Sequence, residues 1–104
     1  MPKLITVYWR DIPAQVIVKQ GRASARVQLA DRFQVAIDRA AMRAGKGGSQ
    51  AYLDDWRRSE PLECQGEPQE IARQEAARLE HAYGEALLER MVKAGGVLPV
   101  DASA

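Results

Sequence analysis

The chain has 104 residues, a formal net charge of +1, 46% hydrophobic residues and 28% charged residues. This length and composition predict one globular domain with its own hydrophobic core, and they exclude a chain that is disordered throughout. The single cysteine, Cys64, excludes an internal disulfide, and no apolar run is long enough for a secretion signal or a membrane span, so we expect a cytoplasmic protein.

The first predicted element is a β-hairpin. Residues 4–9 are rich in β-branched and aromatic side chains, and apolar side chains fall on both sides of the strand. Residues 10–13 interrupt this run because Pro13 fixes its own φ angle and has no backbone donor, and residues 14–18 resume it.

A third strand and a helix follow the turn at residues 20–22. Alternation of Ala25, Val27 and Leu29 with polar residues predicts a strand with one apolar side. A helix of about 14 residues is predicted from Asp31 to Ala44, with Asp31 as its N-cap and Gly45 as its terminator. Its apolar residues repeat at helical spacing and suit packing on the sheet: Phe33, Ala36, Ile37, Ala40, Ala41 and Ala44.

A short second helix is predicted after the loop at residues 45–48. Ser49 is its expected cap, Tyr52, Leu53 and Trp56 share one face, and Arg57 and Arg58 lie in its last turn, where cations are favourable. Pro61 ends this element, and residues 62–65 alternate in the manner of a short edge strand.

The longest predicted element is a helix from Pro68 to Ala94, with proline at its first position. At 1.5 Å per residue it would be about 40 Å long, which exceeds what a domain of this size needs for its core. Either one end protrudes or another molecule binds it. Gly95 and Gly96 end the helix, and its predicted apolar stripe is Ala72, Ala76, Leu79, Tyr83, Leu87, Met91 and Ala94.

Strands followed by helices predict an α+β fold: a three- or four-stranded, mainly antiparallel sheet covered by two longer helices and one short helix. We expect a single domain over residues 1–100 and a disordered tail over residues 101–104.

Charge is divided unevenly along the chain. Residues 1–58 carry 11 Lys and Arg against 5 Asp, a net +6, and residues 59–104 carry 4 Lys and Arg against 9 Asp and Glu, a net −5. This division either attracts a polyanion to the first half or lets the last helix neutralise it internally. We favour internal neutralisation, because both halves belong to one domain, and we expect no measurable affinity for nucleic acid at physiological salt.

Two groups of residues combine aromatic rings with charge and are candidate binding sites. The first is Tyr8, Trp9, Arg10 and Asp11 at a strand end, which can hold a ligand or simply cover a small core. The second is Trp56, Arg57 and Arg58, which would form a basic patch with Arg39, Arg43 and Lys46 or remain a solvated arginine surface. Lys46 also lies in a glycine-rich loop that lacks the spacing of a phosphate-binding loop, so a helix connector is favoured.

The sequence marks no catalytic or metal-binding constellation. The single histidine, His81, and Cys64 fall in different predicted elements, too few for a metal site. No nucleophile motif surrounds any serine or Cys64. We therefore predict no cofactor and no catalytic residue, and favour a non-catalytic protein over a small enzyme subunit with a site near residues 8–11.

Four segments together resemble the small bacterial virulence factor domain family, which is related to the domain in conserved virulence factor C. They are YWRDIPAQVIV at 8–18, RFQVAIDRAAMRAG at 32–45, YLDDWRR at 52–58 and the glutamate-rich last helix. The resemblance implies a context of folate- or cobalamin-dependent methyl transfer and supplies no catalytic residues. We accordingly expect an accessory protein with a protein partner, such as a component of a methyl-transfer system or a second copy of the chain, and no membrane association.

Overall fold

The computed structural model describes residues 1–46 and 50–98, and within them the predicted α+β fold is confirmed. The predicted cap Ser49 and the predicted tail lie outside the described residues. The elements are β1 (Lys3–Trp9), β2 (Ile12–Gln20), β3 (Ala23–Gln28), α1 (Asp31–Arg43), α2 (Gln50–Asp54), β4 (Trp56–Arg58), β5 (Leu62–Glu63), α3 (Pro68–Ala82) and α4 (Glu85–Lys93).

The strands form one antiparallel sheet in the order β3-β2-β1-β4, with β5 pairing the same edge of β1 as β4. The predicted hairpin is confirmed, and Arg10 in its two-residue turn has a left-handed φ of 54°. Pro13 belongs to β2 rather than interrupting the strand. The register passes from Val7 opposite Gln15 to Tyr8 opposite Pro13, and this bulge accommodates a residue that cannot donate to the ladder.

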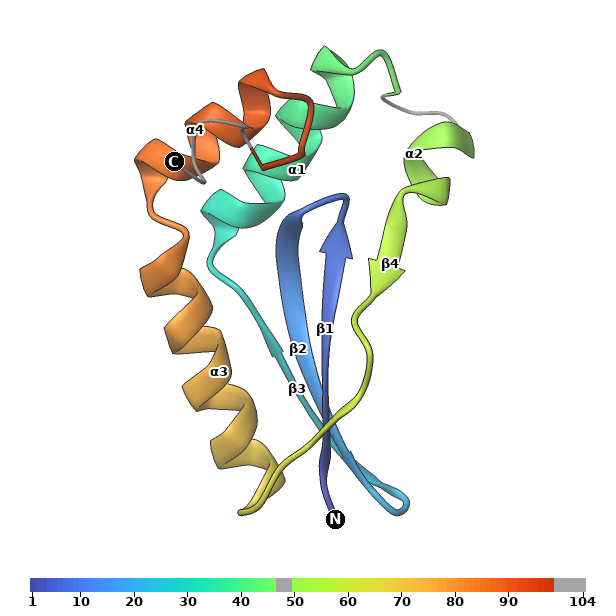
Figure 1. The fold of residues 1–104 in the computed structure, drawn as a ribbon, viewed down its shortest axis with the longest axis vertical. Coiled ribbons are helices and arrows are strands. Elements are labelled where there is room, and N and C mark those ends of the chain that lie inside the picture. Colours follow the sequence, from blue (N-terminus) through green and yellow to red (C-terminus); the bar gives the residue numbers. More distant parts are fainter. Residues whose placement is uncertain (47–49, 99–104) are drawn as a thin grey trace.

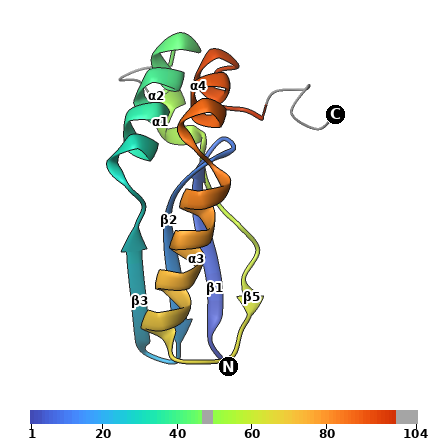
Figure 2. The same cartoon turned by 90° about the vertical axis from the view of Figure 1, so that its left-hand side faces the viewer.

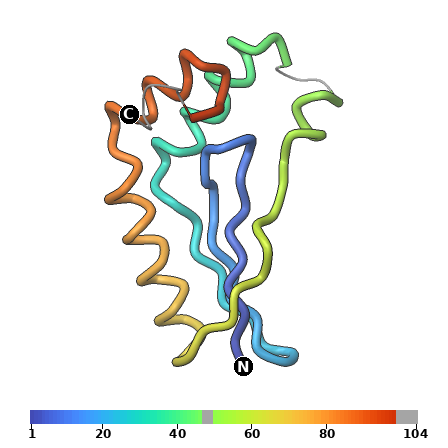
Figure 3. Tube along the Cα trace, viewed as in Figure 1, coloured from blue at the N-terminus to red at the C-terminus, as the bar shows by residue number. Residues whose placement is uncertain are grey.

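Residues 56–58 form strand β4, so their predicted place in the last turn of a helix is wrong. The helix α2 is only five residues long and ends at Asp54. Beyond it, Trp56 to Arg58 pairs with Val7 to Trp9, and the ladder is extended by Ser59 N donating to Thr6 O. An isolated short helix is marginal, whereas pairing satisfies the backbone groups along the β1 edge. Figure 3 shows this segment running back beside β1.

The helices occupy one face and one end of the sheet (Figures 1 and 2). The helix α3 runs along the sheet and contacts β2 and β3, and α1, α2 and α4 gather at the end where the hairpin turns. The principal core lies between these layers. Among its fully or nearly buried members are Trp9, Ile12, Val16, Phe33, Ile37, Ala72, Leu79 and Met91.

The predicted single helix over residues 68–94 is wrong, because the chain breaks between α3 and α4. Tyr83 leaves the helical region with φ −110° and ψ 73°, and Gly84 is the extended N-cap of α4. Glycine is a poor helix residue, and the change of direction lets α4 pack against α1. The predicted stripe holds for Ala72, Ala76, Leu79 and Met91. Tyr83 and Leu87 are only partly buried, Ala94 is exposed, and α4 buries Leu88 and Val92 in addition.

The helix α1 is nearly as predicted but begins differently. Its N-cap is Ala30, without a side-chain cap, and Asp31 is the first helical residue, where a carboxylate still suits the helix dipole. Gly45, with φ 75°, follows the C-cap as predicted. The alanine-rich side is buried, but it packs mainly on α4 rather than on the sheet.

Helices cover one face of the sheet but not the other. Leu4, Val16, Val18, Ala25 and Val27 belong to the core beneath α3, whereas Ile5, Val7 and Ile17 form a separate apolar cluster. No helix in residues 1–46 and 50–98 lies over this second cluster (Figures 1 and 2). We call this side the open face. Strand alternation and register place on it Lys3, Ile5, Val7, Gln15, Ile17, Lys19, Ser24, Arg26, Gln28, Arg58 and Glu63. The same alternation continues to Trp9 and Trp56 at the hairpin end, where Trp9 is buried in the principal core and Trp56 packs against both clusters.

Within the described part of the chain, no helix is both long enough and apolar enough to cross a bilayer.

Candidate functional site

Pairing of β1 with β4 brings the two predicted groups of residues together. Tyr8 is opposite Arg57, and Trp9 is opposite Trp56. The two groups therefore form one cluster at the hairpin end of the sheet, beneath α1, α2 and α4. Arg57 and Arg58 are neighbours in a strand, however, so their side chains leave opposite faces and the predicted basic patch is divided.

Trp9 is part of the core rather than a ligand-binding ring. Its side chain is fully buried, its indole Nε1 donates to the backbone oxygen of Tyr52 at 2.8 Å, and its ring stacks on Tyr52 with centroids 5.7 Å apart. Trp56 contacts Tyr52 edge-on at 6.0 Å and is partly buried. The aromatic residues thus link α2 to the sheet.

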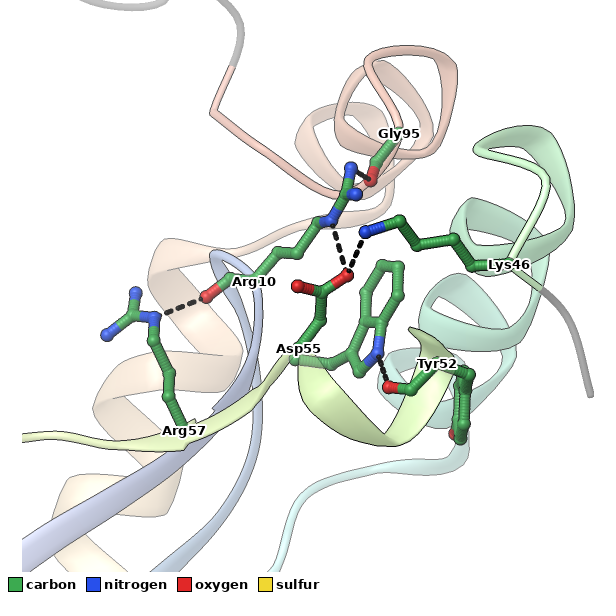
Figure 4. Close-up of polar contacts among 7 residues, drawn as sticks. Arg10, Lys46, Tyr52, Asp55, Arg57 and Gly95 are labelled. Atoms are coloured by element: carbon green, nitrogen blue, oxygen red, sulfur yellow. Dashed lines mark hydrogen bonds and ion pairs between the residues drawn. The ribbon is translucent and has the colours of Figure 1, made fainter. Parts of the chain in front are cut away.

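Asp55 is the centre of the polar contacts at this end (Figure 4). Its Oδ2 accepts from Lys46 Nζ at 2.8 Å and from Arg10 Nε at 3.2 Å, and Arg10 also donates to the backbone oxygen of Gly95 at 2.9 Å. The hydrogen bond from Lys46, with that from Arg10, lowers the pKa of Asp55 below its ordinary 3.8 despite the opposing effect of burial. The carboxylate is therefore ionised at neutral pH, and its Oδ2 is engaged by two cations of the same chain.

Arg57 and Asp11 form a second set of contacts on the hairpin turn. Arg57 donates from Nε to the backbone oxygen of Arg10 at 2.8 Å and from Nη2 to Asp11 Oδ1 at 3.2 Å, and its guanidinium lies 4.5 Å from the centre of the Tyr8 ring. The other oxygen of Asp11 accepts from the Leu98 backbone at 2.9 Å. These contacts hold the left-handed turn and the chain after α4 in place.

Tyr83, at the break between α3 and α4, is a further titratable group near this cluster. Burial raises its pKa above 10.0, and the charges of Tyr8 and Asp11 add to that effect. A phenol with a raised pKa stays protonated at neutral pH and is not a nucleophile. In the part of the chain that the structure describes, no three His, Cys, Asp or Glu residues are placed to hold a metal ion.

The remaining predicted residues separate from the cluster. Arg58 lies exposed on the open face, and Arg39 on α1 pairs instead with Glu89 of α4 at 3.0 Å. Sequence reasoning did not identify Asp55, Tyr52, Gly95 or Gly96, although each contacts a predicted residue. Asp54 and Asp55 look equivalent in the sequence, and only the β4 pairing shows which one turns inward.

The family to which the chain belongs follows from a match over most of its length. The family model described as "Virulence factor" matches residues 7–92. The chain belongs to the virulence factor family. The match spans the hairpin from Val7 onward, all four helices except the last residue of α4, and the contacts of Asp55 with Arg10 and Lys46. Comparison of this virulence factor domain with curated proteins and with solved structures finds no match.

Proposed function

We propose that this virulence factor domain is a non-catalytic interaction protein. The observation that carries the proposal is the use of the predicted site in internal contacts: Asp55 binds two cations, Asp11 binds Arg57 and a backbone amide, and Trp9 is buried. A catalytic group needs a free lone pair or proton aimed at a substrate. The internal contacts of Asp55 and Asp11 weigh against the alternative of an enzyme with a site at residues 8–11.

The helical end offers a surface for a protein partner. On α1, Val35 and Met42 lie two turns apart with 54% and 73% of their side chains exposed, and Leu53 on α2 is 57% exposed. Beside Val35, a groove of about 350 Å³ separates α1 from α4. Exposed apolar side chains beside a groove favour docking of another protein over binding of a charged small molecule.

One sequence-based ground for an interaction protein no longer applies, because the final helix is not overlong. The β1 edge of the hairpin is also closed to pairing with another chain, since β4 and β5 pair with it. The proposal therefore rests on the internally paired cluster and on the exposed residues of α1. The methyl-transfer context that the family resemblance implies supplies the candidate partner, and a second copy of the chain is the alternative partner.

Affinity purification from the native host, followed by mass spectrometry, tests the proposal. The wild-type chain should recover a stable partner, and Val35→Asp/Met42→Asp should lose it because charge is placed in an apolar contact. Ala77→Asp/Ala82→Asp on the exposed side of α3 adds the same charge elsewhere and should retain the partner. Recovery of no partner, together with turnover of a methyl-transfer substrate by the isolated protein, would reverse the proposal in favour of an enzyme.

A further inference from the structure

The open face carries cations without carboxylate partners. Lys19, Arg26 and Arg58 are exposed on three different strands, and within residues 1–46 and 50–98 none of them forms an ion pair. Lys3 is next to Glu63 in the register, so this pair of charges cancels. The open face thus has a net charge of about +3, spread across the sheet rather than gathered at one point.

The acidic helices do not neutralise these cations. The helix α3 lies on the opposite face of the sheet, where Glu70 and Glu75 pair with Arg73 and Arg78 of the same helix. Glu89 pairs with Arg39 at the helical end. The expectation that nucleic acid would be repelled assumed that the glutamates pack near the basic residues. That premise does not hold for the open face.

The composition of the open face favours a polyanion over an apolar protein surface. Ile5, Val7 and Ile17 are only 8%, 9% and 1% exposed, so a partner would gain little by covering them. What remains accessible is a set of guanidinium, ammonium and amide groups with one aromatic ring. Protein interfaces usually have an apolar centre, whereas single-stranded nucleic acid requires cations for its phosphates and a ring on which a base can stack.

A shallow depression lies where that aromatic ring meets the cations. It has a volume of about 370 Å³ and is lined by Val7, Gln15, Trp56, Arg57 and Arg58. Trp56 is partly exposed there, and Gln15 supplies an amide that can both donate and accept hydrogen bonds. The depression therefore combines a π surface, a hydrogen-bonding amide and a guanidinium within one site.

We infer that the open face binds single-stranded nucleic acid, with Lys19, Arg26 and Arg58 on phosphates and one base in the depression beside Trp56. The open face belongs to a five-stranded sheet, whereas a duplex major groove admits a helix or a two-stranded ribbon, and this difference in width favours a single strand. This surface is separate from the α1 surface proposed for a protein partner, so either can fail without the other.

Fluorescence anisotropy with labelled twelve-residue oligo(dT) and oligo(rU) tests the inference on the full chain. Three phosphate contacts predict a log–log salt slope of about −2, so binding should weaken roughly 20-fold between about 50 and 200 mM salt. In Arg26→Gln/Arg58→Gln one contact remains, and the same change of salt should weaken binding only about threefold. Glutamine retains part of each aliphatic stem and so continues to cover Ile17 and Val7.

A matched control changes the same charge elsewhere. Arg43→Gln/Arg73→Gln, on α1 and α3, should keep the wild-type slope. If the open-face double variant does not fold by circular dichroism, Lys19→Gln alone should reduce the slope by about one third, since it removes one of three contacts. Three results would overturn the inference: no binding of either oligonucleotide at low salt, an unchanged slope in the open-face variant, or equal competition by poly-L-glutamate, which would indicate an acidic protein as the ligand.

Discussion

Asp55 joins three segments that are distant in the sequence. It lies between α2 and β4 and binds Arg10 in the hairpin turn and Lys46 after α1, and Arg10 in turn reaches Gly95 beyond α4. Neutralising a partly buried carboxylate that binds two cations removes an ionic acceptor from both of them. The residue is thus expected to stabilise the helical end of the fold rather than to react with a substrate.

Asp55→Asn should destabilise the protein by about 1 kcal/mol, because the amide binds the two cations far less strongly. Asp54→Asn is the matched control: Asp54 is exposed and accepts from Gln50, so its replacement should cost less than about 0.5 kcal/mol. Urea unfolding at neutral pH measures both. Equal effects of the two substitutions would contradict the role assigned to Asp55.

The difference in stability between the wild type and Asp55→Asn should depend on pH. The pKa of Asp55 is lower in the folded state than its ordinary 3.8, so ionisation of this group stabilises the fold above that value. The contribution is lost as the pH falls below 3.8 through the pKa of the folded state. The difference in stability between wild type and Asp55→Asn should therefore be largest near neutral pH and shrink in acid, and a difference that grew in acid would have the wrong sign.

For the helices and strands, the sequence predicts local structure well but predicts poorly which segments pack against each other. The hairpin, the one-sided strand β3, the body of α1 and the start of α3 at Pro68 all follow from alternation, helical spacing and turn residues. The failures at β4 and at the α3–α4 break have one cause. Both depend on where a segment packs, which is the edge of β1 for β4 and the helix α1 for α4. The local spacing of apolar residues does not encode such long-range contacts.

The candidate site was likewise predictable in its local composition but not in its long-range contacts. The sequence singled out residues 8–11 and 56–58, because aromatic and charged residues are concentrated there. It could not predict that Tyr8 and Trp9 would meet Arg57 and Trp56 across a ladder, because that pairing joins positions nearly fifty residues apart. It also placed Arg57 and Arg58 on one helical turn, whereas a strand separates them onto two faces.

A glycine beyond the end of α4, Gly96, lies against Trp9 of β1. Gly96 has φ 98°, and a Cβ atom there would lie 2.6 Å from Cζ3 of Trp9, which is part of a buried, stacked ring. Gly96→Ala should therefore destabilise the fold by about 2–4 kcal/mol, from backbone strain and steric overlap together. Gly45→Ala isolates the strain, because Gly45 has φ 75° with no atom within 4 Å of a Cβ, and it should cost only about 1 kcal/mol. Thermal or urea unfolding that gave equal losses would contradict the close packing of Gly96 on Trp9.

At the scale of the whole molecule, the helices are unevenly distributed. Helices cover one face of the sheet and its hairpin end, and no helix of the described residues covers the other face (Figures 1 and 2). Among the residues of that other face, Lys19, Arg26 and Arg58 are exposed. Small domains usually bury one face of an antiparallel sheet and leave the other to solvent, so the arrangement is stable without a ligand. The net positive charge of the open face is what makes it a candidate binding surface rather than an ordinary solvated one.

The proposed binding surface requires that the open face is accessible in the isolated protein. Thiol labelling measures that accessibility directly. In a Cys64→Ser background, Gln15→Cys places a thiol on the open face of the central strand β2, and Val16→Cys places one on the adjacent residue beneath the helices, where the side chain is fully buried. A buried thiol reacts only when the structure opens, so the thiol at position 15 should react at least about 100-fold faster than the one at position 16. Comparable protection of both positions would show that the open face is covered, and it would contradict binding of any ligand on that face.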